Sequence, residues 1–143
     1  MKRLILAATL AAAHAVTPAF AGETPAPEGA AVYFIEPADG AVISGPVTVK
    51  FGLSGMGVAP AGTEREKTGH HHVFIDREPF DPARDADDPI PSDDNHKHFG
   101  GGQTETTLDL APGTHTLQMV LGDAFHVPHA TPVVSGQITI TVK

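Results

Sequence analysis

The sequence predicts an all-β fold built from short strands. Two observations favour it: runs rich in Val, Ile and Thr with alternating polarity recur along the chain, and turns containing Gly or Pro separate them. After the N-terminal region we find neither helical periodicity of useful length nor an internal repeat. Without its first 21 residues the chain has 143 − 21 = 122 residues, a length that suits one domain with a hydrophobic core.

The N-terminal residues predict an export signal. Lys2 and Arg3 precede a short apolar stretch, Leu4–Ala13, and Ala19-Phe20-Ala21 offers the small residues that a signal peptidase reads. The apolar stretch is shorter than the roughly 20 residues that a permanent membrane span needs. We therefore predict that Met1–Ala21 is a cleaved signal peptide and that the protein is periplasmic or secreted. An N-terminal helix of a cytosolic domain is the alternative, and it leaves the Ala-x-Ala pattern unexplained.

The composition of the mature chain excludes several kinds of partner. Removal of Lys2 and Arg3 takes the formal net charge from −8 to −10. An acidic domain is expected to repel nucleic acid and anionic lipid and to attract cations, so we predict no nucleic-acid partner and no membrane insertion after signal cleavage. The chain has no cysteine, which excludes disulfides and zinc sites built on thiolate.

The elements follow one another along the mature chain in a simple order. Gly22–Ala30, rich in Pro, Gly and Ala, predicts a flexible leader, and residues 31–143 form the domain. In the segment Pro46–Leu53, apolar side chains alternate with Thr48 and Lys50, the pattern of a half-buried strand. Strands are predicted at Ala31–Glu36, Pro46–Leu53, His71–Asp76, Thr104–Leu110, Thr114–Leu121 and Gly136–Val142.

The connections between these strands complete the fold prediction. Arg77–Asn95 holds four prolines and seven acidic residues, which predicts a long solvated loop. Leu110–Leu117 contains a tight Ala-Pro-Gly turn and predicts a hairpin that joins two adjacent strands. Strands of this number and spacing predict a small antiparallel immunoglobulin-like β-sandwich of about seven strands, with a closed β-barrel as the alternative.

Histidines are the most informative residues of the mature chain. Eight remain after signal removal; seven fall in three tight groups and His115 stands alone. Imidazole is a common ligand of transition metals, and residues two apart in a strand share a face, so His70 pairs with His72 and His96 with His98. Loops gather at the ends of a sandwich, so the groups can meet there. The predicted metal ligands are His70, His72, His96, His98, His126 and His129.

Three further residues are candidates for a supporting role. His71 is left undecided between ligand and neighbour. Glu105 and Asp123 are candidate carboxylates for orienting imidazoles, and Asp123 is favoured because it lies three residues before His126. His115 shares a face with hydrophobic residues, which predicts a histidine held by hydrogen bonds rather than by a metal.

The types of ligand atom limit which metal ions suit the predicted site, but they do not select one. A site rich in nitrogen and free of thiolate suits Cu(II), Zn(II) or Ni(II), and we predict copper or zinc. Met56 and Met119 are the only methionines of the mature chain, too few for a methionine-rich Cu(I) site. No motif predicts an organic cofactor.

Three functions stay open on this basis. The first is metal handling or storage in the periplasm. The second is a non-enzymatic interaction module that binds a periplasmic protein, with histidines that are structural or respond to pH. The third is a copper or zinc metalloenzyme, so whether the protein is an enzyme is left undecided.

Five motifs together resemble a known bacterial family, the exported proteins called domain of unknown function 4399. The similarity covers about Ala31 to Val142, and the long acidic insert after Asp76 departs from it. The resemblance implies a periplasmic β domain and brings no established activity. The motifs are Gly-His-His-His (69–72), His-x-His-Phe-Gly-Gly-Gly-Gln-Thr-Glu (96–105), Leu-Gly-Asp-x-x-His-x-Pro-His (121–129), Phe-Ile-Glu-Pro-x-Asp-Gly (34–40) and Gly-Met-Gly-Val-Ala-Pro-Ala-Gly (55–62).

Overall fold

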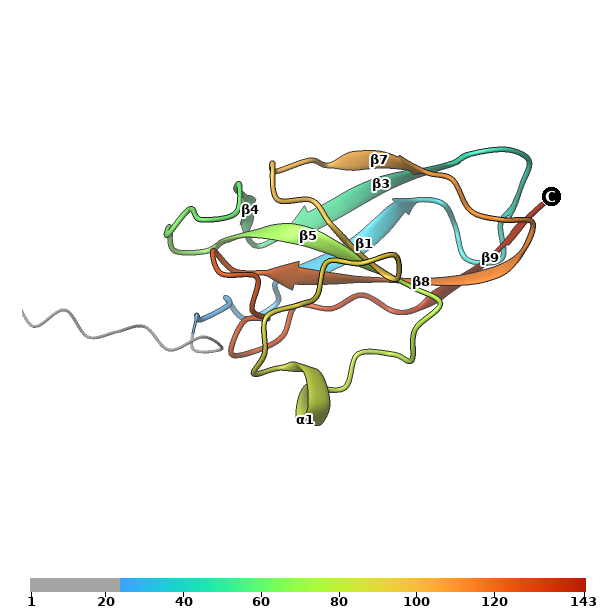
Figure 1. The fold of residues 1–143 in the computed structure, drawn as a ribbon. Helices are drawn as coiled ribbons and strands as arrows, with labels where there is room; N and C mark the ends of the chain where they lie inside the picture. The colour runs from blue at the N-terminus through green and yellow to red at the C-terminus, as the bar shows by residue number, and fades with distance from the viewer. Residues whose placement is uncertain (1–23) are drawn as a thin grey trace, which may run out of the picture.

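The computed structural model describes residues 24–143, and the predicted signal peptide lies outside the described residues. The described chain is nearly all β and forms two sheets that lie in layers (Figure 1). This confirms the predicted sandwich, with nine strands in place of about seven. None of the helices in this part of the chain is long and apolar enough to cross a membrane.

The first sheet contains three antiparallel strands in the order β1–β3–β7. Its strands are β1 (Ala31–Glu36), β3 (Val47–Ser54) and β7 (Glu105–Leu108). The alternation predicted for the middle strand is present, because Val47, Val49 and Phe51 are buried while Thr48 is exposed. This sheet therefore supplies one wall of the hydrophobic core.

The second sheet contains six strands in the order β2–β9–β8–β5–β4, and β6 also pairs with β5. Its strands are β2 (Val42–Ile43), β4 (Gly57–Val58), β5 (Thr68–Ile75), β6 (His96–His98), β8 (Gly113–Gly122) and β9 (Ile138–Val142). Pairing is antiparallel except for β2 with β9 and β4 with β5. Three of these strands, with two or three residues each, are too short to show alternation in the sequence, which is why they were not predicted.

Strand β5 is buried on both faces, because loops cover the side of the sheet that faces away from the core. On the inner face, Val73 and Ile75 join the main core together with Leu117 and Ile140. On the outer face, Phe74 packs in a second cluster with Ile90 and Val120. Alternate side chains of β5 therefore point to opposite faces of the sheet, and both sets are buried.

The long loop after β5 closes this outer face. Its acidic residues are mostly exposed, as predicted, but Ile90 is buried and Phe80 packs against the same cluster. The loop contains the short helix α1 (Pro82–Asp85), which lies on the side of the sheet away from β1 and β3 (Figure 1). The segment thus covers the sheet rather than only linking two strands.

The predicted hairpin at Leu110–Leu117 is wrong. Strand β7 pairs with β3 in one sheet, whereas β8 pairs with β5 and β9 in the other, so the Ala-Pro-Gly turn crosses between the sheets. The burial of both flanking strands explains this path, since Leu108 and Leu117 enter the same core from opposite walls. A tight turn and alternation are common to a hairpin and to a crossover, so the sequence pattern does not separate them.

Candidate metal centre

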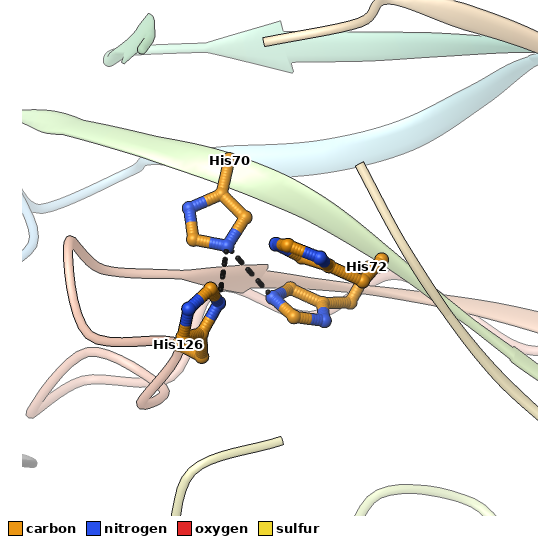
Figure 2. Close-up of side chains that lie close together, drawn as sticks. His70, His72 and His126 are labelled. Carbon is orange, nitrogen blue, oxygen red and sulfur yellow. Dashed lines mark hydrogen bonds between the residues drawn. The ribbon is translucent and has the colours of Figure 1, made fainter. Parts of the chain in front are cut away.

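Four histidines from three separate segments converge on the outer face of β5. Each of them offers one ring nitrogen, and these four nitrogens lie within 4.8 Å of one another. His70 and His72 come from β5, His98 from β6, and His126 from the loop after β8. Figure 2 shows the rings of His70 and His126 side by side, on the side of β5 that faces away from β1 and β3.

Strand geometry places three of the four rings. His70 and His72 share the outer face of β5 because they are two residues apart, as the sequence predicted. His98 lies directly opposite His72 in the antiparallel ladder between β5 and β6. The ring centroids of His72 and His98 are 5.0 Å apart, and those of His70 and His72 are 4.8 Å apart.

A tight turn positions the fourth ring. The Asp123 carboxylate accepts hydrogen bonds through Oδ1 from the backbone N–H groups of Phe125 and Val127, at 2.8 and 3.0 Å. His126 itself adopts a positive φ of 70°, a left-handed conformation that costs a non-glycine residue free energy. Its carbonyl accepts a hydrogen bond from the backbone N–H of Ile90, which ties this turn to the loop that covers the face.

The leader also contacts this turn. The hydroxyl of Thr24 donates a hydrogen bond to Oδ2 of Asp123 at 2.7 Å. The carbonyl of Thr24 accepts a hydrogen bond from the backbone N–H of Ala130. Both oxygens of the Asp123 carboxylate are therefore occupied. Asp123, predicted to orient an imidazole directly, instead holds the backbone turn that presents His126.

The nitrogen atoms of the centre are close together and incompletely hydrogen-bonded. Nε2 of His70 lies 3.0 Å from Nε2 of His72 and 3.1 Å from Nδ1 of His126 (Figure 2). Nδ1 of His70, Nδ1 of His72 and Nε2 of His98 are buried and have no partner among the described residues. The unpartnered Nδ1 atoms of His70 and His72 are the other nitrogens of those two rings and do not face the nitrogens that meet. Nε2 of His70 meets two ring nitrogens but has only one in-plane hydrogen-bonding position, so hydrogen bonds do not satisfy all three nitrogens, which favours a cation as their common partner.

Burial also keeps these imidazoles neutral. Burial, followed by the neighbouring imidazoles, lowers the pKa of His70 to about 4 and that of His72 to about 2. Burial, followed by the proximity of His126, lowers the pKa of His98 as well. A neutral imidazole has a free lone pair, which is the form that binds a metal ion.

Two of the six predicted ligands lie outside the cluster. His96 is two residues from His98 but lies opposite Phe74 in the ladder, and its Nδ1 is 2.9 Å from Oδ1 of Asp93. His129 is buried, and its Nε2 lies 3.3 Å from the carbonyl oxygen of Thr68. Each of these two sequence pairs therefore contributes one ring to the cluster. His98 and His126 belong to it, whereas His96 lies beside Asp93 and His129 beside the carbonyl of Thr68.

The remaining candidates have other surroundings. Glu105 is exposed on β7, in the opposite sheet, where it is paired in register with Lys50. His115 is held by hydrogen bonds to Asp76 and to the carbonyl of Ala111, as its sequence context predicted, and these raise its pKa. His71 points into the core, where its ring lies 5.0 Å from that of Phe51.

Replacing His71 with leucine is expected to stabilise the protein. Among residues 24–143, neither ring nitrogen of His71 has a hydrogen-bond partner, although the side chain is fully buried. Removing an unsatisfied buried polar group should raise the free energy of unfolding by about 1–3 kcal/mol. Urea denaturation measures this change. His129→Leu is the matched control, and it should destabilise because it breaks a contact with Thr68; a destabilising His71→Leu would contradict the described packing.

Two glycines, Gly100 and Gly122, leave the space that the rings occupy. A Cβ atom at Gly122 would lie 2.8 Å from Nε2 of His72 and 3.4 Å from Cα of His126. A Cβ atom at Gly100 would overlap the ring of His98. Glycine inside a strand can mark such a close approach, so Gly122 at the end of β8 was the available signal.

A Gly122→Ala variant is therefore expected to bind a metal ion more weakly, by about 10–100-fold, the range found when the support of a metal ligand is removed. The added methyl group displaces His72 and His126 from each other. Competition against a chelator measures the affinity. Gly136→Ala is the control, because a Cβ there meets nothing within 4 Å. Equal affinities of the two variants would show that this close approach is unimportant.

A comparison with known protein families shows to which family the chain belongs. A family model described as Domain of unknown function (DUF4399) matches residues 49–143. The chain belongs to this family. The match includes all four clustered histidines of this DUF4399 protein, and it confirms the resemblance seen in the sequence motifs. No curated protein and no solved structure matches the chain.

Proposed function

We propose that this DUF4399 protein is an exported transition-metal-binding protein that handles or stores copper or zinc in the periplasm. The observation that supports it is the convergence of four imidazoles from three segments, with one nitrogen from each ring within 4.8 Å of the others. Nitrogen ligands suit both metals, and a tetrahedral site takes four such donors. Export is supported by the N-terminal pattern of Met1–Ala21.

The burial of the four histidines supports a metal-binding role for the cluster. His70 and His72 are fully buried, His98 and His126 are half-buried, and a loop covers the face. Nε2 of His70 meets both Nε2 of His72 and Nδ1 of His126, and hydrogen bonds alone do not satisfy all three nitrogens in a purely structural cluster. The net negative charge of the domain favours the approach of a cation.

Metal content tests the proposal. The untagged full-length gene is expressed with its own signal, and the mature protein is purified from the periplasm without chelators for elemental mass spectrometry. We expect about one equivalent of copper or zinc per chain and an N-terminus at Gly22. Protein that is recovered metal-free and does not take up Cu²⁺ or Zn²⁺ would contradict metal binding, while an intact N-terminus would contradict the predicted cleavage.

A further inference from the structure

The four imidazole rings occupy the corners of a distorted tetrahedron. The shortest distance between ring centroids is 4.6 Å (His98–His126), the longest is 5.9 Å (His72–His126), and the other four are 4.8 to 5.1 Å. A square with such sides would need two diagonals of about 7 Å to suit a square-planar ion. No pair of rings is that far apart, so the arrangement is three-dimensional rather than planar.

The shortest distances between nitrogens are those of ligands that share one metal ion. Zinc–nitrogen bonds of about 2.0–2.1 Å place the ligand atoms of a tetrahedron about 3.3 Å apart. Nε2 of His70 lies 3.0 Å from Nε2 of His72 and 3.1 Å from Nδ1 of His126. These distances lie between the value for a tetrahedron and the roughly 2.9 Å of neighbouring ligands in a square plane, so the ring positions, rather than these distances, favour the tetrahedron. With all four ligand atoms within 4.8 Å of one another, small movements of the side chains are enough to close the site around one ion.

The donor set contains nitrogen alone. The Asp123 carboxylate is the acidic group of the adjoining turn, and both of its oxygens already accept hydrogen bonds. Met119 belongs to the main core on the other face of the sheet, and Met56 packs against that same core. Hard ions that require oxygen and soft ions that require sulfur therefore find no suitable ligand here.

We infer that the ion held by this centre is Zn²⁺, bound by His70, His72, His98 and His126 together; this inference rests on the proposed function. Zn²⁺ has no geometric preference of its own and accepts four imidazoles in a tetrahedron. Cu²⁺ and Ni²⁺ prefer tetragonal arrangements, which the ring positions oppose, and Cu⁺ prefers thiolate or thioether ligands.

The same ligand count indicates how the ion is used. Catalytic zinc sites keep three protein ligands and one open position for water or substrate, whereas closed sites use four protein ligands. Four histidines fill all positions of a tetrahedral ion. The centre therefore holds its zinc ion without presenting it to a substrate, which favours storage, transfer or stabilisation over hydrolysis.

Optical spectroscopy of the cobalt-substituted protein tests the inference. Co²⁺ is the probe: the purified mature protein, stripped of metal, is titrated with Co²⁺ and then with Zn²⁺, and a second sample is loaded with Cu²⁺ for electron paramagnetic resonance. We expect the intense visible bands of tetrahedral Co²⁺ and their complete loss after one equivalent of Zn²⁺. The Cu²⁺ spectrum should show the small parallel hyperfine splitting of a site forced towards a tetrahedron. His129→Gln is the control and should leave every spectrum unchanged.

The outcomes separate this inference from the proposed function. A tetragonal Cu²⁺ spectrum with four equatorial nitrogens, or weak six-coordinate Co²⁺ bands that Zn²⁺ does not remove, would overturn the zinc assignment while leaving metal binding intact. A protein that binds none of the three ions would overturn both. Tetrahedral Co²⁺ bands that stay unchanged in a His70→Ala, His126→Ala double variant would also overturn it, because an ion that needs neither histidine lies elsewhere.

Discussion

A variant with both His70→Ala and His126→Ala is expected to lose its one-equivalent metal site. These substitutions remove two nitrogens that lie 3.1 Å apart and come from different segments, so His72 and His98 are left as two ligands. Two imidazoles do not complete a tetrahedral site, and we expect the affinity to fall by far more than the roughly 10–100-fold produced by loss of a supporting contact. Isothermal titration with Zn²⁺ and Cu²⁺ measures the loss.

The control for this variant uses two histidines that the sequence predicted as ligands. His96 and His129 are buried but lie outside the cluster, so a His96→Ala, His129→Ala double variant should keep one equivalent. Circular dichroism of both variants confirms that each is folded. If the control loses the metal and the His70/His126 variant keeps it, the ligand set described here is wrong.

Mild acid is expected to destabilise the metal-free protein strongly. In the fold, burial lowers the pKa of His70 and His71 to about 4 and that of His72 to about 2, whereas in the unfolded chain each titrates near 6.5. Below pH 6.5 the unfolded state therefore binds more protons, and the free energy of unfolding falls as pH falls. Each proton contributes about 1.4 kcal/mol per pH unit, so the loss reaches several kcal/mol by pH 5. Above pH 6.5 these three groups contribute no pH dependence.

Urea denaturation of the metal-free protein between pH 4 and 8 measures this effect. His71→Leu should reduce the slope below pH 6.5, because one of the three buried imidazoles is absent. His115 acts in the opposite direction, since its raised pKa stabilises the fold at low pH and this contribution is lost as pH rises. His115→Gln should therefore remove a contribution that is lost as pH rises above 6.5, and it should leave the slope below pH 6.5 unchanged. A stability that is flat from pH 7 to 5 would contradict the burial of neutral imidazoles.

Much of the fold follows from local patterns. Alternation in Pro46–Leu53 and in Gly136–Val142 predicted β3 and β9, because one face of each strand meets a core and the other meets solvent. The sheet to which each strand belongs depends on long-range pairing, which local alternation does not encode. For that reason the turn near Pro112 was predicted as a hairpin and is a crossover.

The candidate site was predictable in its residue types but not in its membership. All four clustered histidines are among the six predicted ligands. Strand spacing explains this for His70, His72 and His98, whereas His126 was predicted from its position in the group His126–His129. The choice of His98 over His96 depends on the register that places His98 opposite His72 and His96 opposite Phe74. The roles of Gly122 and of the Thr24–Asp123 hydrogen bond depend on contacts between distant segments, which a single sequence does not reveal.

The most direct test of the metal centre is the anomalous diffraction of crystals of the purified, metal-loaded protein, recorded on both sides of the zinc absorption edge. We predict one strong peak per chain, within bonding distance of nitrogens from His70, His72, His98 and His126. A peak at any other group of residues, or well-ordered histidine rings with no peak between them, would contradict the account.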